Sequence, residues 1–295
     1  MLKFRILPRE EFSFFSKEDV YSYTKDRPGV LEDIDIFKEG KRSQGHPSDF
    51  SLFTESDDAD ILVFPYYLEL FEYFGKPELT IPVVSSICKS NPNKIVVVQW
   101  NHDLDLCRRY PDLKLFDNLR VLNFNTSEKH KNDIILPFWT IAVDPLKVEN
   151  KYTYGFIGKI THPVRQILVN SFKDHPSFCN FTNLEHEDFR KAVGSCVFSF
   201  CPRGAGLSSY RFFECFHLNT IPVLFADSVE LPFPDINYEE ICVRIPERRA
   251  EDRDYIISIL DKVDQEIMLK NINMVRERFT LKGVQEEVHR CLLNL

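Results

Sequence analysis

One segment of the sequence gathers residues that can hold an anion. It reads CPRGAGLSSYRFFE, and it combines two arginines, two closely spaced glycines and two adjacent serines: Arg203, Arg211, Gly204, Gly206, Ser208 and Ser209. Guanidinium groups offer fork-shaped donors that suit phosphate oxygens. The glycines let the backbone turn tightly and let a ligand approach closely. The segment therefore predicts a site for a phosphate-bearing ligand.

The elements around this segment must place it at the edge of a sheet. An apolar run predicts a strand over residues 195–200, and Pro202 is expected to end its hydrogen-bond ladder. A helix is predicted over 209–218, capped by Ser208 or Ser209. A helix N-terminus at the carboxyl end of a parallel strand favours an anion. A diphosphate leaving group gains charge as a glycosidic bond breaks, so the same donors would stabilise that transition state.

Glu214 lies about one helical turn beyond the serines. A carboxylate at this place can accept both ribose hydroxyls of a nucleotide, as acidic residues do in other nucleotide sites. Arg211 and Glu214 also have the spacing of an ordinary surface pair on a helix, and each glycine taken singly fits a simple turn. The combined order of Pro-Arg-Gly, serines, arginine and glutamate favours the ligand site.

Short apolar runs alternate with helical stretches along the chain, which is typical of an α/β fold with parallel sheets covered on both faces. The predicted strands cover residues 4–7, 61–64, 94–99, 120–124, 134–136, 152–157, 195–200, 220–225 and 241–245. The predicted helices cover 65–74, 163–172, 187–192, 209–218, 252–263 and 265–279. A polar stretch at 142–151 is expected to separate two domains, and the polar segment 38–49 is expected to be a loop.

Composition narrows the classes of partner. The chain has 295 residues and a net charge of -8, so the global basic field of a non-specific nucleic-acid binder is absent. No signal peptide and no membrane span are expected, and the eight cysteines show no metal-site spacing. We therefore expect buried free thiols and a cytoplasmic location.

The segment closely resembles the signature of the exostosin family, glycosyltransferase family 47. The matching elements are Phe198, Cys201-Pro202-Arg203-Gly204, Ser209, Arg211, Glu214, Ile221-Pro222-Val223 and Leu231-Pro232-Phe233. Weaker similarity extends over residues 59–65, 100–103, 133–138 and 156–158, together with Arg165. Trp100-Asn101-His102-Asp103 departs from the family's usual Gly-Arg-Asp-His type of motif, which affects the acceptor side. A compact form without anchor or stem is similar to the short exostosin-like enzymes of some large algal viruses.

The resemblance implies a GT-B fold, in which two Rossmann-like domains face a cleft. The acceptor-side domain is expected over 1–145, the donor domain over 146–282, and a C-terminal helix over 283–295 that crosses back to the first domain. Gly158 would begin the first loop of the donor domain, and Arg165 would offer a second charge to the diphosphate. The resemblance also implies inverting transfer from a nucleotide-diphosphate sugar, usually UDP-linked, without an essential metal.

Inverting displacement needs a general base near the acceptor hydroxyl. Asp103 and His102 are the candidates, because they follow the strand predicted over 94–99; Glu69 and Asp49 remain open. Asp103 also fits the cap of a short helix over 105–109. Two Asp-x-Asp sequences, at 33–35 and 103–105, spell the metal motif of another glycosyltransferase fold. The basic loop supplies the charge that a metal would bring, so no cofactor is expected beyond the UDP-sugar itself.

Two functions remain open at this point. The first is a glycosyltransferase that acts on a glycan or glycoprotein acceptor, with UDP-xylose as the leading donor, because no spare cation for a uronate is evident. The second is a non-catalytic nucleotide-sugar- or glycan-binding subunit on the same fold. A kinase or phosphatase is disfavoured, because the sequence contains neither a GxxxxGK[ST] loop nor a convincing nucleophilic cysteine with a phosphate loop.

Overall fold

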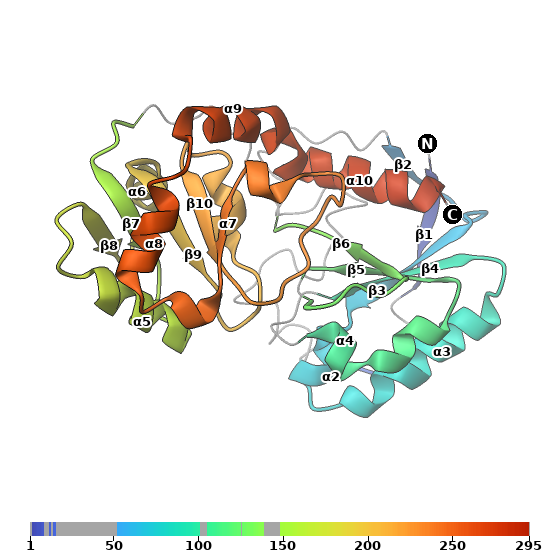
Figure 1. Ribbon diagram of the computed structural model, residues 1–295. Coiled ribbons are helices and arrows are strands. Elements are labelled where there is room, and N and C mark those ends of the chain that lie inside the picture. Colours follow the sequence, from blue (N-terminus) through green and yellow to red (C-terminus); the bar gives the residue numbers. More distant parts are fainter. Residues whose placement is uncertain are drawn as a thin grey trace. The chain divides into compact units, whose positions relative to one another are not determined.

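The computed structural model describes residues 2–8, 12, 14–15, 52–100, 105–124, 126–138 and 148–294 (Figure 1). They form two compact units. Unit 1 comprises Met1–Leu136, Glu230–Pro232 and Leu281–Leu295, and unit 2 comprises Pro137–Val229 and Phe233–Thr280. Each unit contains one sheet whose neighbouring strands are all parallel. The expected α/β class with two Rossmann-like units is therefore confirmed.

The sheet of unit 1 has the strand order β2-β1-β3-β4-β5-β6. Its strands are β1 (Leu2–Ile6), β2 (Phe53–Glu55), β3 (Ile61–Tyr67), β4 (Ile95–Trp100), β5 (Leu119–Asn123) and β6 (Asp133–Ile135). The side chains of β3 are all buried, as are those of β4 after its first residue. Strands buried on both faces are typical of a parallel sheet with helices on either side.

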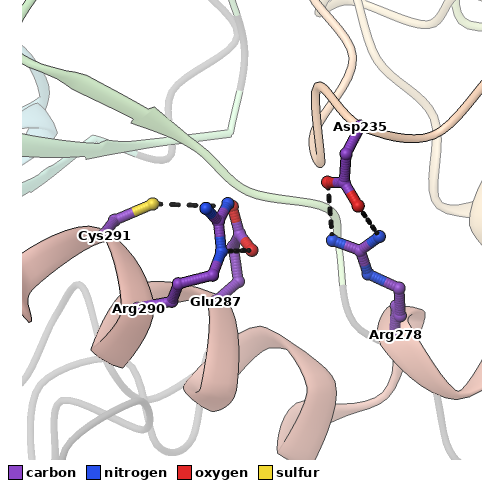
Figure 2. A network of polar contacts seen from close by, with 5 residues as sticks. All are labelled: Asp235, Arg278, Glu287, Arg290 and Cys291. Carbon is purple, nitrogen blue, oxygen red and sulfur yellow. Dashed lines mark hydrogen bonds and ion pairs between the residues drawn. The ribbon is translucent and has the colours of Figure 1, made fainter. Parts of the chain in front are cut away.

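The helices of unit 1 lie on both sides of this sheet. Helices α2 (Glu69–Tyr73), α3 (Thr80–Ser90) and α4 (Leu106–Arg109) lie on one side and α10 (Leu281–Leu293) lies on the other (Figure 1). On α10, Arg290 donates to the carboxylate of Glu287, which also lies 3.5 Å from the Cys291 sulfur (Figure 2). Figure 2 also shows an ion pair of unit 2, in which Arg278 donates two hydrogen bonds to Asp235.

The sheet of unit 2 has the order β11-β10-β9-β7-β8. Its strands are β7 (Tyr152–Ile157), β8 (Phe178–Phe181), β9 (Cys196–Pro202), β10 (Ile221–Phe225) and β11 (Val243–Ile245). Its helices are α5 (Pro163–Phe172), α6 (His186–Gly194), α7 (Tyr210–Cys215), α8 (Arg253–Leu260) and α9 (Gln265–Val275). Short 3-10 helices complete both units: η3 (Pro77–Leu79), η4 (Pro111–Leu115), η5 (Tyr238–Glu240), η6 (Glu247–Arg249) and η7 (Arg276–Phe279).

The order of strands in unit 2 fixes where a ligand binds. From β7 the chain first adds β8 on one side and then adds β9 on the other side. In open α/β sheets, ligands bind outside the carboxyl ends of the strands at such a point of reversal. The loops that follow β7 and β9 therefore form the expected binding edge of unit 2.

Several predicted elements are wrong in their bounds. The helix expected over 65–74 begins only at Glu69, because β3 continues through Pro65 to Tyr67, and its register against β4 shifts there. Strand β9 runs on to Pro202, which pairs with Phe225 at the end of the ladder. Strands β2 and β8 and helix α3 were not predicted, since β2 and β8 are short and α3 contains a proline near its start.

Some predictions fall on residues outside the described ranges. They include the loop over 38–49, both members of the Asp33–Asp35 pair, and most of the expected boundary over 142–151. The domain limits therefore stay a prediction.

The cysteines with described side chains, from Cys88 to Cys291, are free thiols. In the part of the chain that the structure describes, no helix is both long and apolar enough to cross a bilayer.

Candidate anion-binding site

Two loops meet at the reversal point of unit 2. The first follows β7 and spans residues 158–162, and the second follows β9 and spans residues 203–209. Arg165, in the first turn of α5, joins them: it donates through Nη1 to the Lys159 carbonyl, through Nε to the Arg203 carbonyl and through Nη2 to the Pro202 carbonyl, at 2.8, 2.9 and 3.3 Å. This side chain therefore fixes both loops relative to each other.

Arg165 is buried and faces other cations. Burial lowers the pKa of its guanidinium to about 10, and the neighbouring Arg211 lowers the pKa further in the same direction. Gly204 leaves room for this side chain, since a Cβ at that position would lie 2.9 Å from Arg165 Nη2. Each guanidinium nitrogen of Arg165 donates to a carbonyl. Its predicted role as a direct diphosphate ligand stays a prediction.

Arg211 lies beneath the first loop. Its guanidinium carbon is 4.7 Å from the centre of the Phe156 ring, and its Nη2 fills the place that a side chain at Gly158 would take. Gly158 has φ +147°, a conformation that non-glycine residues rarely adopt. The glycine predicted to begin the first loop is therefore required both by the backbone and by the arginine against it.

The charge of Arg211 has no close counter-ion among the described residues. Only 6% of the residue is exposed, and its Nε and Nη1 have no hydrogen-bond partner. Burial lowers the pKa of this guanidinium, while Glu214 acts in the opposite direction. A buried, unpaired guanidinium costs free energy unless an anion supplies acceptors. This geometry points to an anionic ligand at the end of β7.

The helix that carries Arg211 and Glu214 is shorter than predicted. It spans six residues, Tyr210–Cys215, and Ser209 occupies its N-cap position without a side-chain hydrogen bond to the helix. The predicted cap is confirmed in position, since Ser209 is the N-cap residue, but its side chain makes no capping hydrogen bond. Ser208 is half-buried. Glu214 is half-buried, and burial raises the pKa of its carboxyl against the influence of Arg211 and Arg190.

Arg203 lies in the second loop, and Glu247 of η6 approaches its guanidinium. Its Nη2 donates to the Ala205 carbonyl at 3.5 Å, and its Nε lies 4.0 Å from an Oε1 of Glu247. The backbone N–H of Glu247 donates to Asp227 at 3.0 Å. Burial raises the pKa of the Glu247 carboxyl, and Arg203 opposes that shift.

Phe156 was noted only within the family-like stretch 156–158. Sequence reasoning missed three other residues of this site: His162, Asp227 and Glu247. The two acidic residues could have been found from their positions in the sequence. Asp227 and Glu247 each follow the end of a strand, β10 and β11, by two residues, and the carboxyl ends of parallel strands share one edge of the sheet.

The structure describes one of the four candidate bases, Glu69. His102 and Asp103 lie outside the described residues, as does Asp49. Glu69 begins α2 and is 3% exposed. Asp105, the described member of the second Asp-x-Asp sequence, accepts hydrogen bonds from Ser127 and Thr126.

Comparison with known proteins agrees with the motif. The exostosin GT47 domain model matches residues 41–263. "Probable beta-1,4-xylosyltransferase IRX10L" from Arabidopsis thaliana is 32% identical over 117 residues, 38% of this chain and 26% of the relative. "Probable glucuronosyltransferase GUT1" from Oryza sativa subsp. japonica is 32% identical over 124 residues, 41% of this chain and 28% of the relative. The match therefore spans about a quarter of each plant relative.

Shorter and more distant matches extend this comparison. Exostosin-1 from Bos taurus is 35% identical over 79 residues, 26% of this chain and 11% of the relative. Among solved structures, Alr3699/HepE from Anabaena, in complex with UDP, covers 81% of this chain and 79% of its own, with 11% identity and a TM-score of 0.49. The GtfA/B complex covers 80% and 57%, with 9% identity and a TM-score of 0.48. Since the family model spans most of the sequence, the chain belongs to the exostosin GT47 family.

Proposed function

We propose that the protein is a glycosyltransferase that moves a sugar from a UDP-sugar to a hydroxyl of a glycan or glycoprotein acceptor. One observation carries the proposal: the guanidinium of Arg211 is buried at the binding edge of unit 2, and two of its nitrogens lack a partner. A diphosphate supplies the acceptors and the negative charge that this group lacks. Membership of the exostosin GT47 family supports the same chemistry.

The proposed reaction is a direct displacement. The acceptor oxygen attacks the anomeric carbon, the bond from that carbon to the phosphate oxygen breaks, and a general base takes the acceptor's proton. UDP leaves with the bonding electrons, so negative charge grows on the diphosphate. Arg211 and Arg203 would stabilise that charge more strongly in the transition state than in the ground state. Glu214 would accept the ribose hydroxyls, and His102 or Asp103 would serve as the base.

No metal is required in this proposal, because the two arginines supply the positive charge that a divalent cation would bring to the diphosphate. The leading donor is UDP-xylose or another neutral sugar. Glu247 lies 4.0 Å from Arg203, and its N–H donates to Asp227, so a uronate carboxylate beside Arg203 would meet like charges. One plant relative carries the name of a probable xylosyltransferase, and the other that of a probable glucuronosyltransferase.

The test is nucleotide binding followed by turnover. Calorimetry with UDP should give a clear affinity that EDTA leaves unchanged, and Arg211→Met should reduce it by at least about tenfold, the loss of one charge-assisted pair. A thermal-shift panel of UDP-sugars should favour UDP-xylose over UDP-glucuronate. Wild-type protein without any affinity for UDP would refute the proposal.

The second candidate, a non-catalytic binding subunit, is separated from the first by turnover. An enzyme releases UDP from its donor when an acceptor is present. Binding of the UDP-sugar without UDP release, across a panel of glycan acceptors, would favour the subunit.

A further inference from the structure

His162 stands at the start of α5 in a fixed orientation. It occupies the N-cap position with extended backbone angles, and its Nδ1 accepts a hydrogen bond from the Val164 N–H at 3.3 Å. A neutral imidazole has one nitrogen that accepts and one that donates. Since Nδ1 accepts, the proton of the neutral ring is on Nε2. The cap therefore leaves His162 with one free N–H donor on the far side of its ring.

The main chain of α5 offers no such donor in its first turn. The first helical residue is Pro163, which has no N–H. The N–H of Val164 donates to His162 Nδ1, and the N–H of Arg165 donates to the His162 carbonyl at 3.0 Å. Helix N-termini in Rossmann-like folds commonly bind phosphate through free N–H groups. Here those groups are occupied, so a side chain must take their place.

The surroundings of His162 are cationic. Burial lowers the pKa of its imidazole, and the charges of Arg203 and Arg165 lower it further. The loop that carries His162 also contacts the second loop, since a Cβ at Gly204 would lie 3.3 Å from Thr161 Oγ1. The same loop begins at Gly158, against the unpartnered guanidinium of Arg211.

We propose that His162 is a phosphate-binding residue of the donor site, which donates from Nε2 to an oxygen of the nucleotide diphosphate. The inference rests on the proposed function and adds a ligand to it. The imidazole replaces the main-chain donors that Pro163 and the cap have removed from the helix N-terminus. It contributes a neutral hydrogen bond near the charges of Arg203 and Arg165.

A substitution can remove this donor and keep the cap. In His162→Asn, the amide oxygen can still accept from the main-chain N–H groups of the first turn, while the amide NH₂ lies on a side chain too short to reach the position of Nε2. His175→Asn is the matched control, because His175 Nδ1 accepts from the Ser177 N–H at 3.2 Å in the same way, away from the two loops. Each variant is titrated with UDP and with uridine, which has the same nucleoside but no phosphate.

His162→Asn should weaken UDP binding by about tenfold to a hundredfold, the value of one hydrogen bond to a charged group, and leave uridine binding unchanged. His175→Asn should change neither. Equal UDP affinity in His162→Asn and wild type would overturn the inference and leave the proposed function standing, as would an equal loss of UDP and uridine binding. A wild type that binds no UDP would instead overturn the proposed function.

The tautomer provides a second measurement that does not depend on the nucleotide. Long-range ¹⁵N–¹H spectra of the imidazoles should show one ring, absent from His162→Asn, that carries its proton on Nε2 at neutral pH. A proton on Nδ1 of that ring would overturn the inference, because the donor would then face the helix.

Discussion

Arg211 occupies the space where residue 158 would carry a side chain. A Cβ built on Gly158 would lie 1.8 Å from Nη2 of Arg211 and 3.0 Å from its guanidinium carbon. Real Cβ atoms do not approach other heavy atoms so closely, so the glycine and the arginine depend on each other. The two belong to different strand-loop-helix units of the same sheet, which ties the loop after β7 to helix α7.

Gly158→Ala should therefore remove UDP binding as effectively as the loss of Arg211. The added methyl group displaces the guanidinium, and the backbone at φ +147° becomes strained. We expect at least about a tenfold loss of affinity in calorimetry, equivalent to about 1.4 kcal/mol.

Gly75→Ala is the matched control for this substitution. Gly75 also has positive φ, +67°, but an added Cβ there would meet no atom within 4 Å. It measures backbone strain alone, of about 1 kcal/mol. Normal UDP affinity in Gly158→Ala would show that the guanidinium can move aside without loss of function.

Arg211→Met should stabilise the free protein while it weakens UDP binding by at least about tenfold. The arginine buries a charge with two unpartnered nitrogens, whereas methionine would pack against the Phe156 ring without that cost. We expect the free energy of unfolding to rise by about 1–3 kcal/mol, measured by urea denaturation without ligand.

The control for Arg211→Met is Arg278→Met. Arg278 donates two hydrogen bonds to Asp235 at a partly exposed site (Figure 2), so its removal should not stabilise the protein. A decrease in the free energy of unfolding for Arg211→Met would contradict the inference that the Arg211 charge is unpaired without a ligand.

The sequence predicted the ligand loop better than it predicted the contacts within the loop. The order of strand, Pro-Arg-Gly, serines, arginine and glutamate identified β9 and α7 because each step is local along the chain. It could not show that Arg165, on α5, donates to carbonyls of both loops. These hydrogen bonds require β7 and β9 to be neighbours in the sheet. No local sequence pattern predicts the order of the strands.

The errors in element bounds and caps also arise from contacts that no local sequence pattern specifies. Pro65 reads as a strand end, yet β3 accommodates it at a shift of register against β4. Ser209 is the N-cap of α7 as predicted, although its side chain makes no capping hydrogen bond. His162 is a less usual cap than serine or aspartate, so its role at the start of α5 was not predicted. The predicted bases His102 and Asp103 lie outside the described residues and stay predictions.

Arg165→Met should have the opposite effect on stability from Arg211→Met and the same effect on binding. Three carbonyls, of Lys159, Pro202 and Arg203, lose their donor. We expect the free energy of unfolding to fall by at least about 4 kcal/mol, since three hydrogen bonds from a charged group are lost. UDP affinity should also fall, because the loops are no longer joined. Urea denaturation and calorimetry on both variants check this. Equal stability of Arg165→Met and wild type would contradict the structural role of Arg165.

His217 should make the protein less stable in mild acid. It is 2% exposed, and neither ring nitrogen has a hydrogen-bond partner among the residues that the structure describes. Burial, followed by Arg276 and Arg190, lowers the pKa of its imidazole from 6.5 to about 4. Because the folded pKa is depressed, the unfolded chain binds more protons between these two values. The free energy of unfolding therefore keeps this contribution above pH 6.5 and loses it as the pH falls toward 4.

His217→Leu isolates this contribution, because leucine fills a similar volume without a titrating group. Between pH 7.5 and pH 5.0, wild type should lose about 2 kcal/mol more than the variant in urea denaturation, since each pKa unit corresponds to about 1.4 kcal/mol. His162 and His289, whose pKa values are also lowered, contribute equally to both proteins and cancel in the difference. Parallel pH profiles for the two proteins would mean that His217 accepts its proton within the folded structure without cost.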